Sequence, residues 1–86
     1  MREFAIKFKS HDDHGSFSVW LVKFRKTERY ADGRLPLHCR LHCEDAKIFK
    51  DKETALRVLG EVRSEIAKRG FVSDWHIDDN GQVHEF

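Results

Sequence analysis

One stretch decides the fold of this chain: residues 48–70, IFKDKETALRVLGEVRSEIAKRG. Its apolar residues recur at helical spacing on one narrow stripe, and charged and polar residues fall on the opposite side. The stripe consists of Ala55, Leu59, Val62 and Ile66. Asp51 suits the N-cap, and Gly70 stands where a left-handed residue is favoured at a helix end. The pattern predicts an amphipathic helix that lies on an apolar surface.

The residues before this helix have the patterns of three strands. Residues 2–9 alternate with the period of a half-buried strand, and residues 16–26 are rich in aromatic and β-branched residues. Residues 10–16 join them as a loop. Residues 35–43 alternate again, with leucines and cysteines on one side and histidines and an arginine on the other. We expect this third strand to continue in broken form towards Phe49.

The residues after the helix predict a hairpin. Residues 71–78 have the pattern of a strand, and Asn80-Gly81 is typical of a tight type I′ turn. The expected cross-strand pairs are Ile77 with His84 and Trp75 with Phe86. One apolar face would then consist of Trp75, Ile77 and Phe86. The whole chain, residues 1–86, is therefore expected to form a single α+β domain: an antiparallel β-sheet of four to five strands with one α-helix packed on one face, in the order β-β-β-α-β-β.

Length and composition exclude several classes of function. A domain of 86 residues has room for one core but not for a spacious internal pocket, so we expect neither an enzyme nor a small-molecule substrate. Sixteen basic against fifteen acidic residues give a net charge of +1, so nucleic acid could be bound only by a local basic patch. No apolar run approaches the roughly 18 residues of a membrane span. We expect a cytoplasmic protein with both cysteines reduced.

Two clusters contain residues that can ligate metals. His38, Cys39, His42 and Cys43 fall within six residues, but a strand would point the cysteines one way and the histidines the other. We therefore expect both cysteines in the core. His11, Asp12, Asp13 and His14 are expected to form a solvated turn. Metal binding by His11, His14, His38 or His42 stays open, whereas no cofactor and no catalytic residue are predicted, because GxSxG and a phosphate-binding glycine loop are both absent.

The sheet face that the helix leaves uncovered is the candidate site. The residues expected on this face are Lys7, Lys9, Trp20, Val22, Phe24, His38, Arg40 and His42. Three interpretations of the face are open. Its apolar part could be covered by Trp75, Ile77 and Phe86, it could dock a protein partner or a second copy of the chain, or its cations and aromatic rings could bind nucleic acid.

The first hypothesis for function is a non-enzymatic interaction protein. It would bind a protein partner through the sheet face or through a helix flank at Gly60, as small phage or accessory proteins do when they inhibit a host defence complex. The alternative is a nucleic-acid-binding domain that uses the basic and aromatic sheet face. Residues 46–55, in which an aromatic residue ends a strand and an alanine opens the helical stripe, resemble the strand-to-helix passage in the arm-binding domains of phage integrases.

Overall fold

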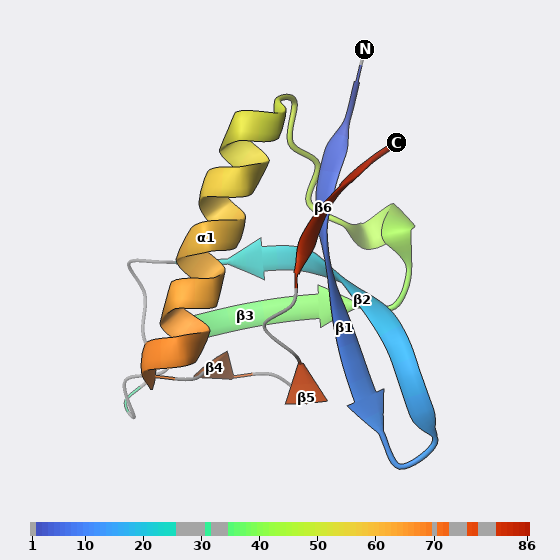
Figure 1. Ribbon diagram of the computed structural model, residues 1–86, viewed down its shortest axis with the longest axis vertical. Coiled ribbons are helices and arrows are strands. Elements are labelled where there is room, and N and C mark those ends of the chain that lie inside the picture. The colour runs from blue at the N-terminus through green and yellow to red at the C-terminus, as the bar shows by residue number, and fades with distance from the viewer. Residues whose placement is uncertain (1, 26–30, 32–34, 70, 73–75, 78–80) are drawn as a thin grey trace.

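The chain folds as one β-sheet with one α-helix packed against it, which confirms the predicted α+β class (Figure 1). The computed structural model describes residues 2–25, 31, 35–69, 71–72, 76–77 and 81–86. In chain order the elements are β1 (Phe4–Asp12), β2 (Gly15–Phe24), β3 (Leu35–Arg40), the short 3₁₀ helix η1 (Cys43–Asp45), α1 (Lys52–Arg69), β4 (Phe71–Val72), β5 (His76–Ile77) and β6 (Gln82–Glu85). The described part of the chain contains no helix that is long and apolar enough to span a bilayer.

β1 has paired strands along both of its edges. It pairs antiparallel with β2 on one side and with β5 and β6 on the other, while β2 pairs antiparallel with β3. The short β4 pairs parallel with the start of β3. The first hairpin is tighter than the predicted loop over residues 10–16, because Asp12 pairs directly with Gly15. The Asp12 carboxylate accepts the backbone N–H of His14 at 2.8 Å, and Gly15 has a φ of 136° that favours glycine.

The predicted C-terminal hairpin is wrong. Ile77 pairs with Ser10 and His84 pairs with Ala5, so β5 and β6 both run along β1 rather than against each other. Figure 1 shows β5 and β6 following one another beside β1. One edge of the nine-residue strand β1 pairs with β2. The opposite edge offers its backbone N–H and C=O groups to both β5 and β6. Asn80 and Trp75, on which the hairpin prediction depended, lie outside the described residues.

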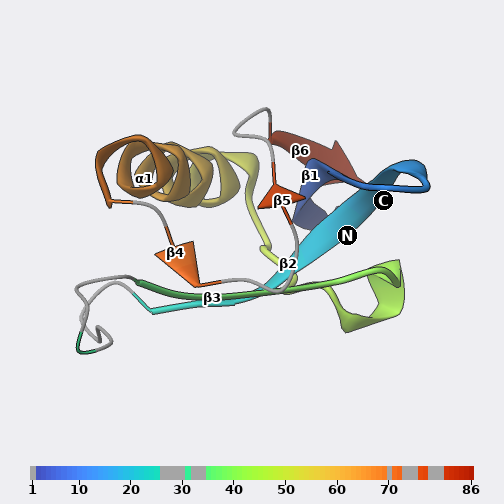
Figure 2. The same cartoon turned by 90° about the horizontal axis from the view of Figure 1, so that it is seen from below.

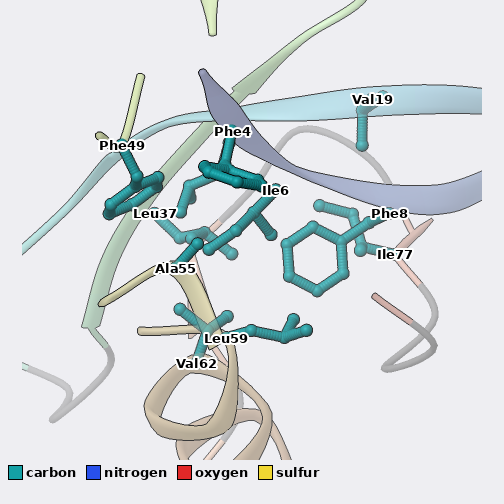
Figure 3. Packing of buried hydrophobic residues seen from close by; sticks show 11 residues of the cluster. Phe4, Ile6, Phe8, Val19, Leu37, Phe49, Ala55, Leu59, Val62 and Ile77 are labelled. Atoms are coloured by element: carbon teal, nitrogen blue, oxygen red, sulfur yellow. The ribbon is translucent and has the colours of Figure 1, made fainter. Parts of the chain in front are cut away.

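The core lies between α1 and the inner face of the sheet, which is the face towards α1 (Figure 2). Figure 3 shows side chains of β1, β3 and the helix meeting in this layer, with Phe49 at one end and Ile77 at the other. The buried members of the cluster are Phe4, Ile6, Phe8, Val19, Leu21, Leu37, Phe49, Ala55, Leu59, Val62 and Ile77. Ile66 packs against them and is partly buried. The predicted helical stripe is therefore confirmed.

The helix begins where the sequence predicts. The Asp51 carboxylate accepts the backbone N–H of Thr54 at 2.7 Å and the Thr54 hydroxyl at 2.8 Å, which is the geometry of an N-cap. These hydrogen bonds from Thr54 lower the pKa of Asp51 below its ordinary value, because they stabilise the carboxylate form. Gly70, the predicted C-terminal residue of the helix, lies outside the described residues.

The passage between β3 and α1 returns across the sheet. β3 ends at Arg40 instead of continuing to Cys43, and η1 reverses the chain. The backbone N–H of Lys47 then bonds Leu21 O at 2.8 Å, and Phe49 forms an antiparallel bridge with Phe4. This passage is therefore hydrogen-bonded both to the start of β1 and to β2, and it places Phe49 in the core.

Candidate functional site

Strand register defines the sheet face that points away from α1, here called the outer face. Lys7 pairs with both Gln82 and Trp20, and Trp20 pairs with Arg40, so these four residues form one row across four strands. Paired residues place their side chains on the same face, and residues two apart along a strand share that face. The charged or aromatic strand residues of the outer face include Lys7, Lys9, His11, Trp20, Lys23, His38, Arg40 and His84.

Five of the predicted site residues lie on this face, namely Lys7, Lys9, Trp20, His38 and Arg40. The prediction is wrong for Phe24, which pairs with the buried Leu37 and packs against the core. The cause is a β-bulge: Leu21 pairs with Cys39 but Lys23 pairs with His38, so Val22 is an extra residue. The bulge reverses the alternation, and Lys23 takes the outer position instead.

The two remaining predicted site residues stand apart from the row. Val22, the extra residue of the bulge, is partly buried and has no cross-strand partner in β3. His42 lies beyond the end of β3, where it precedes η1 and is exposed. Neither residue belongs to the outer face as register defines it.

A cluster of three rings stands on the outer face: Trp20, His84 and Phe86. The Trp20 and Phe86 rings are stacked, with centroids 5.8 Å apart and planes 22° apart. The His84 ring is steeply inclined to both rings, with its centroid 5.1 Å from that of Trp20 and 4.9 Å from that of Phe86. Ala5, the register partner of His84, is 0% exposed although it lies on the outer face, which indicates that the cluster covers it.

The sequence interpretation missed His84 and expected Phe86 to share a face with Ile77. In the structure Ile77 is buried in the core, whereas Phe86 stacks on Trp20 across the sheet. The available signal was the alternation of residues 82–86, in which Val83 points inwards and His84 and Phe86 do not. That signal becomes useful only once β6 is known to pair with β1.

The described strand residues of the outer face carry charge of one sign, and Glu3, which precedes β1 and lies opposite Phe86 by register, adds a carboxylate at its edge. Lys7 Nζ lies 5.6 Å from the Trp20 ring centroid, and Lys9, Lys23 and Arg40 are exposed. Within the described residues none of these four cations makes an ion pair, and no strand residue on the outer face is acidic. Glu85, the acidic residue of β6, pairs with Phe4 of the inner face and its carboxylate binds Arg2 at 3.2 Å. Such a surface attracts anions.

The cysteines and histidines do not form a metal centre in the part of the chain that the structure describes, where no group of three potential ligands is found. Cys39 is on the inner face and burial raises the pKa of its thiol to about 12, so the core prediction is confirmed for Cys39. It is wrong for Cys43, which is exposed in η1 because β3 ends three residues earlier. Cys39 is thus an unreactive thiol at neutral pH.

No protein-family model, curated protein or solved structure matches this chain, and the resemblance to integrase arm-binding domains therefore gains no support. The function must be argued from the outer face itself.

Proposed function

We propose that this protein is a non-enzymatic module that binds nucleic acid across its outer face. The observation that carries the proposal is the combination of four cations with an aromatic cluster on a face whose described strand residues include no carboxylate. Lysine and arginine side chains bind phosphates, and flat aromatic rings accept bases. The row through Lys7, Trp20 and Arg40 alternates these two kinds of group at the spacing of adjacent strands, about 4.8 Å.

The protein-partner hypothesis depended on a continuous apolar patch of Trp20, Val22 and Phe24. The β-bulge moves Phe24 to the core and leaves Val22 partly buried, so the apolar part of the outer face shrinks to the ring cluster. Large docking surfaces for proteins have an apolar centre with few charges. On the outer face the cations lie beside the aromatic rings, and this arrangement favours a polyanionic ligand over a protein partner.

Because the chain as a whole carries a net charge of only +1, the attraction must be local. Acidic residues are abundant elsewhere, for example Glu44 and Asp45 in η1 and Glu53 in α1. Binding should therefore be weak at physiological salt and strong at low salt. We propose a cytoplasmic location for this activity, and the free thiols of Cys39 and Cys43 support a reducing compartment.

Fluorescence anisotropy with labelled single-stranded DNA and RNA tests the proposal, first at low and then at physiological salt. The wild type should bind with micromolar affinity at low salt. The double variant Lys9→Ala/Arg40→Ala removes two exposed cations of the outer face and should weaken binding by roughly tenfold or more, since each phosphate contact contributes to affinity.

The matched control is Lys52→Ala/Arg57→Ala, which removes two exposed cations from α1 on the other side of the sheet. It changes the net charge equally and should leave affinity within twofold or so of the wild type. Equal losses in the two double variants would contradict binding at the outer face. No binding of any nucleic acid at micromolar protein and low salt would reject the proposal and leave a protein partner as the hypothesis to pursue.

A further inference from the structure

Phe86 is the more exposed ring of the stacked pair on the outer face. Trp20 lies on β2 in the middle of the sheet and is partly buried, whereas Phe86 follows β6 on the other side of β1, stacks with Trp20 and is 52% exposed. One ring neighbour of Phe86 is Trp20 and another is His84, and the exposed part of the Phe86 side chain is what a ligand can reach. Building on the proposed function, we infer that Phe86 is a stacking platform for one base and that the outer face therefore selects single-stranded over double-stranded nucleic acid.

The platform is held in place before any ligand arrives. The backbone N–H of Phe86 donates to Glu3 O at 2.9 Å, which extends the pairing of β6 with β1 by one residue. The His84 ring meets Phe86 at 74° and Trp20 at 88°, so it supports the stack from the side. A ring that is already fixed loses little conformational entropy when a base stacks on it.

The cations lie where the backbone of a stacked nucleotide would need them. Lys7 and Arg40 are the register partners of Trp20 on its two sides, so each lies one strand away from the ring that stacks with Phe86. Lys7 Nζ also lies over the Trp20 ring, which holds this charge beside the stack. A base on Phe86 would thus bring its phosphates within reach of long cationic side chains.

Double-stranded nucleic acid cannot use this platform without distortion. Its bases are already paired and stacked on one another, and taking one out of the duplex costs several kcal/mol. A single strand presents the faces of its bases freely, and each stack on an aromatic side chain strengthens binding by roughly five- to a hundredfold. The same cations would hold a duplex only through its phosphates.

Three probes of one length, about twelve nucleotides, distinguish the contribution of a base stacked on Phe86 from the attraction between the cations and the phosphates. They are oligothymidylate, a strand of abasic sites with the same number of phosphates, and a duplex. The wild type should bind oligothymidylate at least fivefold more tightly than either of the other two probes. The variant Phe86→Leu keeps an apolar side chain without a ring, and it should lose this preference while its affinity for the abasic strand stays unchanged.

Two further variants make the result specific to the ring. Phe86→Tyr keeps a stacking surface and should retain the preference for oligothymidylate. Leu56→Ala removes an exposed apolar side chain from α1, 48% exposed, and should change none of the three affinities. Thermal unfolding of each variant checks that the fold is intact.

The outcomes distinguish the inference from the proposed function. If the wild type binds all three probes equally, or if Phe86→Leu keeps the preference for oligothymidylate, the platform is refuted although the outer face still binds polyanions. If no probe binds at low salt, the proposed function itself is rejected and the inference with it. Loss of preference in Phe86→Leu together with its retention in Phe86→Tyr supports the platform.

Discussion

Two glycines occupy opposite environments, and alanine should therefore have opposite effects at the two sites. Gly60 lies within α1, and a Cβ built there meets nothing within 4 Å. Alanine favours the helix over glycine by about 0.5–1 kcal/mol. We expect Gly60→Ala to raise the free energy of unfolding by about that amount in urea titrations. A loss of stability instead would contradict the open surroundings of Gly60.

Gly81 is buried beside the core and has no room for a side chain. A Cβ there would lie 2.5 Å from Phe8 Cε1 and 2.6 Å from Leu59 Cδ1. The backbone cannot simply retreat, because Arg63 Nη2 donates to Gly81 O at 2.7 Å and β6 begins at the next residue. We expect Gly81→Ala to lower the free energy of unfolding by about 1–3 kcal/mol. Gly60→Ala, measured under the same conditions, is the control for the substitution itself.

The Asp51 cap makes helix stability depend on pH. The bonds from Thr54 lower the pKa of the carboxyl below its ordinary value of 3.8, so folding favours the charged form. The stability that the fold gains from the charged Asp51 carboxylate is complete above pH 3.8 and is lost as the pH falls through the lowered pKa. Asp51→Ala should therefore reduce the urea midpoint at pH 7, and the difference from wild type should narrow at pH 3. A constant difference across this range would show that charge on Asp51 is irrelevant to the cap.

At the scale of elements, local patterns predicted α1 well because its stripe and its cap lie within one short stretch. The same patterns misplaced parts of the strands. Both faces of β2 are apolar, so its sequence fits a regular strand and a strand with a bulge at Val22 equally well. Only the pairing with β3 decides between these two registers. Asn80-Gly81 favoured a local hairpin, but the open edge of β1 gave β5 and β6 a longer partner. Pairing with the distant β1 therefore replaced the predicted pairing of these two segments with each other.

The bulge in β2 separates two neighbouring residues by function. Phe24→Ala removes a ring that packs against the core and should lower the free energy of unfolding by about 1–3 kcal/mol while oligonucleotide affinity at low salt is unchanged. Lys23→Ala removes an exposed cation of the outer face and should have the opposite effect. It should weaken oligonucleotide binding and keep the free energy of unfolding within about 0.5 kcal/mol of wild type.

Urea titration and anisotropy on the same two variants measure both quantities. A binding defect in Phe24→Ala at full stability, with none in Lys23→Ala, would mean that the register through the bulge differs and that Phe24 faces outwards, as simple alternation predicted. The pair thus tests the correction to the candidate site directly.

At the scale of the whole molecule, the sequence predicts total charge but not its distribution. Sixteen basic and fifteen acidic residues nearly cancel, yet the outer face collects Lys7, Lys9, Lys23 and Arg40 without an acidic strand residue. Alternation within single strands was enough to assign Lys7, Lys9 and Arg40 to that face. It could not assign Lys23, His84 or Phe86, because their positions depend on the bulge and on the pairing of β6 with β1.

This distribution of charge predicts how many ions are displaced on binding. A single strand that contacts all four cations should give a plot of log affinity against log salt with a slope of about −3, since each phosphate contact contributes about −0.7. Replacing Arg40 with alanine should make the slope shallower by about 0.7, whereas Lys52→Ala should leave it unchanged although both variants carry the same net charge. Anisotropy titrations at a series of salt concentrations measure these slopes. If both variants shift the slope equally, the molecule acts through its total charge, and the ordered outer face is not what recognises the strand.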